Sequence, residues 1–327
     1  MAGVLVFAEV GEGGLAPIAK ELLAAGRPLA QALGEPLVAF IAAEKAGPLA
    51  QEAGAFGAQQ VYVAEHAFLK DAHPDYHLLA LEQAVKRITP SAVLLGKTPL
   101  GVTVGPRLAF RLGVGVAQDV VSLKVEGGAL IAERPVYGGN AMARVALRQK
   151  PFVATVRPKA FEPLAPQANP SVAVQSIPVS LDASSVKVKV LERKKVEATG
   201  IRLEDARVVV AGGRGLGGPE PFQQLEELAR LLGGAVGASR AVCDAGWLPY
   251  QYQIGLTGKT ITADLYIAVA ISGASQHMAG ISTVKNIVAI NKDGDAPIFQ
   301  EARFGVVGDW KKVLPAFIDE VRKLLQR

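Results

Sequence analysis

Polar loops between Ser239 and Asn291 are the part of this sequence most suited to chemistry. They hold a single arginine, Arg240, and a single histidine, His277, among glycines, hydroxyl residues and amides. Glycines and short side chains let a ligand approach the backbone closely, and free N–H groups at helix starts attract anions. The loops therefore predict a binding site for a flat ligand that carries several negative charges.

Two of these loops follow apolar segments with the length of buried strands. Tyr266 to Ile271 leads into Ser272-Gly-Ala-Ser-Gln-His277, and Ile287 to Ile290 leads into Asn291. Ligands of open parallel sheets bind at the carboxyl ends of the strands. We therefore expect both loops to converge on one crevice.

A glycine-rich turn, Gly212 to Gly218, lies between another predicted strand and a predicted helix. Three of its glycines have the spacing of a dinucleotide-binding fingerprint: Gly213, Gly215 and Gly218. An ordinary glycine-rich turn without a ligand has the same pattern. About 20 residues further on, where NAD-binding proteins place an acidic residue, this chain has Arg240. An arginine there could bind a 2′-phosphate, so an NADP-dependent oxidoreductase is the alternative hypothesis.

Other candidate chemistries have weaker support. His73 and His77 are four residues apart, but Pro74 starts the helix between them and no further metal ligands lie nearby, so we expect no metal site. The single cysteine, Cys243, excludes internal disulfides, fits a reducing compartment and is expected to be a small buried residue. No set of nucleophile, base and orienting residue appears, which favours a cofactor carrier over an enzyme.

The elements that position these residues follow from the hydrophobic pattern. The 327 residues suit two domains, and half of them are hydrophobic. In the first half, strand-like runs alternate with helical segments, which predicts an α/β fold with a doubly wound parallel sheet. The predicted strands of this half are Val4 to Ala8, Leu37 to Ala42, Val61 to Ala64, Ala92 to Leu95 and Phe152 to Val156.

Two further features complete the architecture. Alternating segments on both sides of Gly127-Gly128 predict an antiparallel ribbon that could contact a neighbouring subunit. A proline-rich stretch, Phe161 to Ser185, predicts a linker, so we divide the chain into an α/β domain at 1–185 and a Rossmann-like domain at 186–327. The last helix is amphipathic, and Asp309 suits its N-cap.

Charge and hydropathy exclude several classes of function. The net charge is +5, and basic and acidic residues are interspersed, so we expect no nucleic-acid partner. No apolar run reaches the roughly 18 residues that span a bilayer. The first residues reach a carboxylate at Glu9 too early for a signal peptide, so we expect a cytoplasmic protein that does not insert into a membrane.

Several segments of the second half carry a family resemblance. They are Val236-Gly-Ala-Ser-Arg-Ala241, Asp244-Ala-Gly-Trp247, Gly255-Leu-Thr-Gly-Lys259, Asp264-Leu-Tyr-Ile-Ala268, Ile271-Ser-Gly-Ala-Ser-Gln-His277, Ala289-Ile-Asn-Lys-Asp293 and Ala296-Pro-Ile-Phe299. They resemble the alpha subunit of electron transfer flavoprotein, and the first half agrees with that family in length and strand order. Leu256 departs from the family, in which many members have glutamine.

The resemblance implies one FAD, held mainly by the second domain. Arg214 with the glycine-rich turn, Ser272 and Gly273 would bind the pyrophosphate. Asn291 and Asp309 would serve the adenosine end of the cofactor.

The same resemblance implies the contacts of the isoalloxazine ring. Ser239 and Arg240 would lie against the ring, Thr257 would hydrogen-bond N5, and His277 would face O2. The other implied site residues are Ile254, Gly255, Leu256, Ala274, Ser275, Gln276 and Trp310.

Partners are also implied by the family. They are a beta subunit that forms an obligate heterodimer and usually holds AMP, donors such as the acyl-CoA dehydrogenases of fatty acid beta-oxidation, and a membrane quinone oxidoreductase as acceptor. A third hypothesis, a flavin-free assembly subunit, would need none of these redox partners.

Physical chemistry gives Arg240 a role in one-electron transfer. One added electron places negative charge over flavin N1 and O2, and a guanidinium stays charged. At about 4 Å and an effective dielectric of 20 the attraction is roughly 4 kcal/mol. Even about 2 kcal/mol corresponds to roughly 90 mV, which predicts a stabilised anionic semiquinone.

Structural roles compete with each of these assignments. Arg240 could pair with Asp244, His277 could cap its own helix, and Thr257 could be only a turn residue. Trp247 and Phe299 are expected to be core residues rather than flavin-stacking residues.

Overall fold

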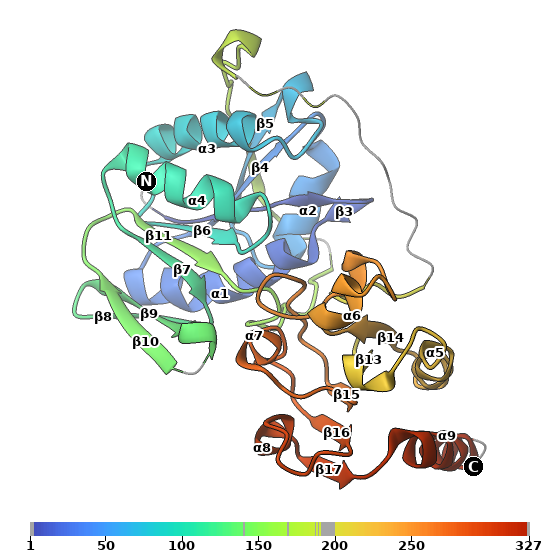
Figure 1. Cartoon of the computed structure of the whole chain (residues 1–327). Coiled ribbons are helices and arrows are strands. Elements are labelled where there is room, and N and C mark those ends of the chain that lie inside the picture. Colours follow the sequence, from blue (N-terminus) through green and yellow to red (C-terminus); the bar gives the residue numbers. More distant parts are fainter. Residues whose placement is uncertain are drawn as a thin grey trace. The chain divides into compact units, whose positions relative to one another are not determined.

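The computed structural model describes residues 3–139, 141–168, 170–186, 188, 190 and 200–325. The chain divides into two compact units (Figure 1), one of residues 1–136 and 141–192 and one of residues 137–140 and 193–327. Parallel sheets covered by helices and an antiparallel ribbon confirm the predicted α/β class. The predicted domain boundary at residues 185 and 186 stays a prediction.

The first unit is built on a seven-stranded sheet in the order β12-β5-β4-β1-β6-β11-β7, and each of its pairs is parallel. Continuous apolar runs form its central strands because both faces of the sheet are covered. The strands are β1 (Val4–Phe7), β4 (Leu37–Ala43), β5 (Gln60–Glu65), β6 (Ala92–Gly96), β7 (Val116–Val120), β11 (Phe152–Val156) and β12 (Ala173–Ser176).

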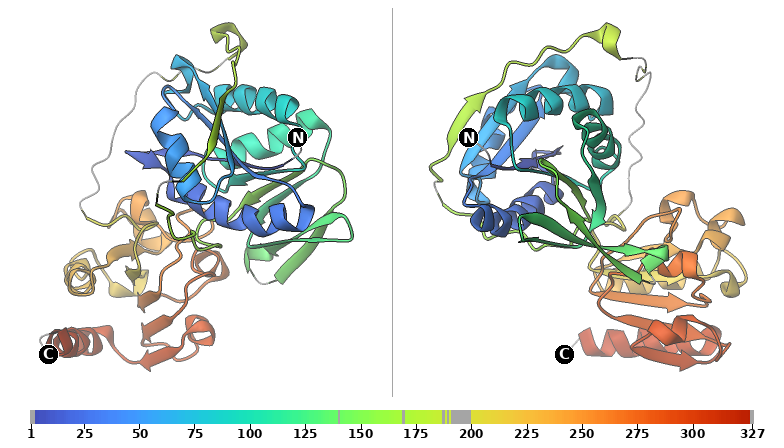
Figure 2. Two further views of the ribbon diagram at one scale, coloured as in Figure 1. Left: turned by 180° about the vertical axis from the view of Figure 1, so that it is seen from behind. Right: turned by 90° about the vertical axis from the view of Figure 1, so that its left-hand side faces the viewer.

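Helices pack against both faces of this sheet (Figure 2). Val4 and Val6 of β1 share a core with α1 (Pro17–Leu33) and α2 (Gly47–Ala55). Leu5 and Phe7 point to the other face and share a core with α3 (Pro74–Ile88) and α4 (Gly101–Leu112). The alternation of side chains along one strand therefore divides the core into two layers.

The predicted ribbon has a third strand. β8 (Ser122–Glu126) and β9 (Ala129–Val136) form the hairpin expected around Gly127-Gly128, and β10 (Ala141–Leu147) pairs antiparallel with β9. A short antiparallel pair, β2 (Val10–Gly11) and β3 (Gly14–Leu15), lies after β1.

The second unit has a five-stranded sheet in the order β14-β13-β15-β16-β17, again with parallel pairs. The chain moves from β13 outward to β14 and then returns to the other side of β13 with β15. This reversal is a topological switch point, where ligands of open α/β sheets bind. The strands are β13 (Val208–Gly212), β14 (Ala235–Ala238), β15 (Leu265–Val269), β16 (Ile287–Asn291) and β17 (Phe304–Val307).

Two groups of helices cover this second sheet. One core layer contains side chains of α5 (Phe222–Leu231), α6 (Arg240–Asp244) and α9 (Trp310–Leu325), and it includes the buried Cys243. The other contains residues of α7 (Ser275–Met278) and α8 (Ile298–Glu301).

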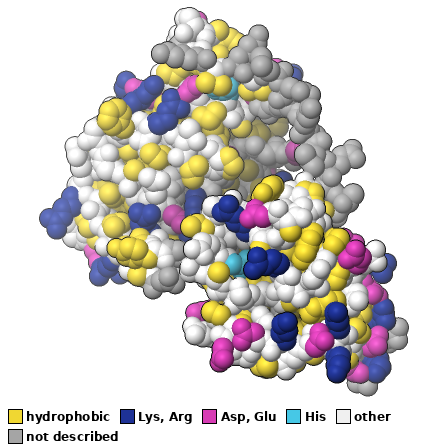
Figure 3. All heavy atoms as spheres, in the orientation of Figure 1, with side chains coloured by type: hydrophobic (Ala, Val, Ile, Leu, Met, Phe, Trp, Pro, Cys, Tyr) yellow, Lys and Arg dark blue, Asp and Glu magenta, His cyan; other side chains and the backbone are white. Residues whose placement is uncertain are grey.

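Basic and acidic side chains are interspersed on the face shown in Figure 3, as the sequence suggests. Among the described residues, no helix is both long and apolar enough to cross a bilayer. In the same part of the chain, no cluster of three or more potential metal-ligating side chains occurs.

Candidate functional site

A cavity of about 710 Å³ opens at the carboxyl edge of the second sheet, around the switch point. Loops that follow β13, β14, β15 and β16 line it, together with the segment 253–257. Its lining includes most of the residues predicted from the sequence: Arg214, Ser239, Arg240, Ile254, Gly255, Leu256, Thr257, Ser272, Ala274, Gln276, His277 and Asn291. The predicted convergence of these loops on one crevice is confirmed.

The turn after β13 touches the loop after β15 directly. A Cβ added to Gly213 would lie 2.1 Å from the backbone oxygen of Ala270, and Ala270 itself has a positive φ of 56°. Only a glycine at position 213 permits this approach, because any side chain would collide with backbone. The short helix η4 (Arg214–Leu216) then begins at the cavity wall.

Arg240 both lines the cavity and forms the ion pair considered above. Its Nε lies 3.3 Å from Oδ2 of Asp244, one helical turn later, and Tyr250 donates its hydroxyl hydrogen to Oδ1 of Asp244 at 2.9 Å. The Arg240 side chain is 66% exposed, so this pair is held weakly. The guanidinium can therefore also serve an anionic ligand in the cavity.

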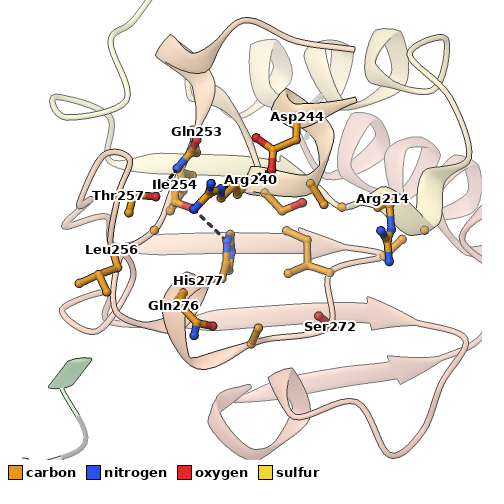
Figure 4. Close-up of a pocket in the computed structure, with 18 of the residues that line it drawn as sticks. Arg214, Arg240, Asp244, Gln253, Ile254, Leu256, Thr257, Ser272, Gln276 and His277 are labelled. Atoms are coloured by element: carbon orange, nitrogen blue, oxygen red, sulfur yellow. Dashed lines mark hydrogen bonds and ion pairs between the residues drawn. The ribbon is translucent and has the colours of Figure 1, made fainter. Parts of the chain in front are cut away.

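The segment 253–257 closes one end of the cavity. Thr257 lies at its tip, and Gln253, which is 4% exposed, donates its side-chain N–H to Oγ1 of Thr257 at 2.9 Å. Figure 4 shows Arg214 toward the other end of the cavity, with Arg240 and His277 between them. The site is therefore elongated, with a cation at one end and a hydroxyl at the other.

Both ring nitrogens of His277 have protein partners. Nδ1 lies 3.1 Å from the carbonyl oxygen of Ile254, which can only accept, so Nδ1 carries the hydrogen. Nε2 is then the acceptor for the Tyr266 hydroxyl at 2.7 Å. Burial lowers the pKa of His277 from 6.5 to about 4, which the bond to Ile254 only partly offsets. His277 is thus neutral at physiological pH.

The side chain of Asn291 links two strand ends. Its Nδ2 donates to the carbonyl oxygen of Ile271 at 2.9 Å, and its Oδ1 accepts from the N–H of Asp293 at 3.0 Å. Asn291 therefore lines the cavity and also connects the ends of β15 and β16 through its hydrogen bonds.

Four predicted site residues do not line the cavity. Gly273 and Ser275 lie in the loop and short helix after β15. Asp309 accepts the N–H of Lys311 at 3.0 Å, which confirms its predicted role as a cap of α9, and Trp310 packs against the α5 and α9 core. Their contacts with a cofactor stay predictions.

Two glycines of the predicted dinucleotide fingerprint, Gly213 and Gly215, also line the cavity. Several other cavity residues were not predicted as site residues. They are Ala241, Asp244, Gln253, Ala270, Ile271 and Asp293. The burial of Gln253 beneath Thr257 had no signal in the sequence, because it depends on how the loop folds.

The fold and the cavity define an α/β protein with an elongated cavity at its switch point, lined by two arginines. Comparison with known proteins makes this specific: residues 4–182 match the electron transfer flavoprotein domain, and residues 202–282 match the electron transfer flavoprotein FAD-binding domain. The chain belongs to the electron transfer flavoprotein alpha subunit family, as its motifs suggested. Members of this family are electron carriers rather than enzymes that transform a substrate.

The similarity extends over almost the whole chain. It is 39% identical to electron transfer flavoprotein subunit alpha of Thermoanaerobacterium thermosaccharolyticum, with 98% of both chains covered. It is 40% identical to the subunit of the same name from Bacillus subtilis, again with 98% of both chains covered. The corresponding Megasphaera elsdenii subunit is 40% identical, over 98% of this chain and 96% of the relative.

Proposed function

We propose that this chain binds one FAD in the cavity of its second unit and carries electrons between a flavin dehydrogenase and a quinone oxidoreductase. The observation that carries the proposal is the convergence of Arg214, Arg240 and Thr257, from separate loops, on one cavity at the switch point. The match of residues 202–282 to an FAD-binding domain supports the choice of ligand.

The cavity residues fit this cofactor. A volume of about 710 Å³ lies within the usual range of roughly 300–1,000 Å³ for cofactor sites. Arg214 and the tight glycine turn at Gly213 provide a cation and close backbone approach for a pyrophosphate. Toward the end that Thr257 closes, the Thr257 hydroxyl, together with Arg240 and Ser239 along the cavity wall, provides hydroxyl groups and a cation for a polar ring system.

FAD supplies the redox chemistry when it is bound, and the chain sets its environment. Arg240 would stabilise negative charge on the half-reduced ring, because its guanidinium cannot lose its proton at neutral pH. Thr257 would donate a hydrogen bond to N5. Flavin O2 is a hydrogen-bond acceptor, whereas Nε2 of His277 already accepts the hydrogen of the Tyr266 hydroxyl. To donate to O2 through Nε2, His277 would have to give up that bond, and the ring hydrogen would have to move from Nδ1 to Nε2.

We further propose that a beta subunit, itself usually holding AMP, completes the functional unit as an obligate heterodimer. The names of the relatives describe alpha subunits, which supports such a partner. Acyl-CoA dehydrogenases and related flavoenzymes would be the donors. The check is size-exclusion chromatography, and a folded, fully flavinated monomer would contradict the heterodimer.

The absorption spectrum of the protein purified with its beta subunit tests the function. We expect a yellow protein with flavin bands and one FAD per alpha chain after acid release. A colourless protein that binds NADPH instead would support the dehydrogenase alternative. A protein that binds neither ligand would support an assembly role.

A further inference from the structure

Gln253 is a buried amide that lies beneath the tip of the cavity loop. Its Nε2 donates to Oγ1 of Thr257 at 2.9 Å (Figure 4). Its backbone is held beside the end of β14, because the N–H of Ile254 donates to the carbonyl oxygen of Ala238 at 2.9 Å. Its own carbonyl oxygen accepts the N–H of Lys259 at 2.7 Å. Gln253 is therefore fixed in place while its side chain reaches Thr257.

Two glycines let the loop close around this side chain. A Cβ at Gly258 would lie 2.4 Å from the carbonyl oxygen of Gln253 and 2.8 Å from its Cγ. Gly255 has a φ of 145°, and a Cβ there would lie 2.9 Å from the carbonyl oxygen of Gln276. That same oxygen accepts the N–H of Leu256 at 2.7 Å. The loop is thus closed at its base by the bond between Lys259 and Gln253 and held to the cavity wall by the bond between Leu256 and Gln276.

The contact decides what the Thr257 hydroxyl can offer to a ligand. A threonine hydroxyl has one hydrogen to donate and two acceptor positions, whereas an amide N–H₂ can only donate. The bond from Gln253 fills an acceptor position and leaves the hydrogen of Thr257 for the cavity.

We propose that Gln253 is a positioning residue that fixes the Thr257 hydroxyl as a hydrogen-bond donor toward the flavin. The proposal rests on the function proposed above. Oxidised flavin N5 accepts hydrogen bonds, and a donor binds a more negative acceptor more strongly. The Gln253–Thr257 pair should therefore raise the first-electron potential of bound FAD.

A double-mutant cycle on the assembled protein tests this role. Thr257→Val removes the donor and should lower the first-electron potential. Gln253→Met keeps a side chain of similar length but removes the hydrogen bond to the Thr257 hydroxyl. It should therefore lower the potential by a smaller amount than Thr257→Val. In the Thr257→Val background, Gln253→Met should cause no additional shift, because Gln253 acts only through the hydroxyl.

Gln253→Glu provides the second, nearly isosteric test. An ionised carboxylate accepts the hydrogen of Thr257, so this hydrogen is no longer offered to the flavin. The direct effect of the new charge on the potential is measured by the same substitution in the Thr257→Val background. After this effect is subtracted, the potential should fall about as far as in Thr257→Val. At a pH low enough to protonate the introduced carboxyl, it can donate to Oγ1 again and the shift should disappear. A purely structural role would show no such recovery.

The possible failures are distinguishable. A protein without flavin contradicts the proposed function and with it this role. Bound FAD with an unchanged potential in Thr257→Val overturns the hydroxyl contact on which the role of Gln253 depends. If the shifts in Thr257→Val and Gln253→Met simply add in the double variant, Gln253 does not act through Thr257. A Gln253 amide that turns its oxygen toward the hydroxyl would also overturn the proposal.

Discussion

His277 shows how burial sets the charge of a single residue at this site. The carbonyl oxygen of Ile254 and the hydroxyl of Tyr266 satisfy both ring nitrogens, and burial lowers the pKa to about 4. Arg240 and Arg214 can therefore provide positive charge in the cavity at neutral pH, whereas His277 provides none.

The lowered pKa of His277 predicts a loss of stability in acid. The unfolded chain binds a proton near pH 6.5 and the folded chain only near pH 4, so the stability present above pH 6.5 is lost as the pH falls toward 4. From pH 7 to pH 5 we expect the protonation equilibrium of this residue to lower the free energy of unfolding by about 2 kcal/mol. Urea unfolding of wild type and His277→Gln measures it. Equal pH dependence in the two proteins would contradict the assignment.

Residue types and strand ends predicted much of the site. Arg240 and His277 share one cavity, because the carboxyl ends of parallel strands must meet at one edge, and Thr257 reaches the same cavity from the segment 253–257. The hydrogen-bond and ion-pair partners of these side chains were harder to predict from the sequence. The Asp244 pair follows from helical spacing, but the contacts of Gln253 and Tyr266 depend on loop and strand packing that no local pattern reports.

At the scale of elements, the turn after β13 can approach the loop after β15 closely because Gly213 has no side chain. Gly213→Ala would place a Cβ 2.1 Å from the backbone oxygen of Ala270, so the two elements must separate. We expect FAD affinity to fall by roughly tenfold or more, which corresponds to about 1.4 kcal/mol. Quenching of flavin fluorescence during titration with FAD measures the affinity.

Gly217→Ala is the matched control in the same turn. Gly217 has a φ of 88°, and no atom lies within 4 Å of an added Cβ. We expect a backbone cost of about 1 kcal/mol in stability and an unchanged affinity for FAD. Equal loss of affinity in both variants would show that the close approach of the two elements is unimportant.

The elements themselves were predicted unevenly, for a physical reason. β1, β4 and β6 were recognisable because both of their faces are buried, so the strands are continuous apolar runs. β17 was not predicted, since its four residues are all exposed and include a glycine. β10 was also missed, because none of its seven residues is buried and it therefore has no apolar run of the kind that marks a core strand.

At the scale of the whole molecule, the two units match different domain families. The first unit has the match to the electron transfer flavoprotein domain, and the second has the switch-point cavity and the match to the FAD-binding domain. Composition and alternating patterns predicted the α/β class. They could not define the boundary, because the proline-rich stretch expected to be a linker contains β12 (Ala173–Ser176), a strand of the first sheet.

Arg240 is proposed to stabilise the negative charge that one electron adds to a flavin in the cavity of the second unit. The most direct measurement is the first-electron reduction potential of FAD in the assembled protein, for wild type and Arg240→Ala. Loss of about 2 kcal/mol of attraction predicts a potential that is lower by roughly 90 mV. An unchanged potential, with FAD still bound at one per alpha chain, would contradict the claim.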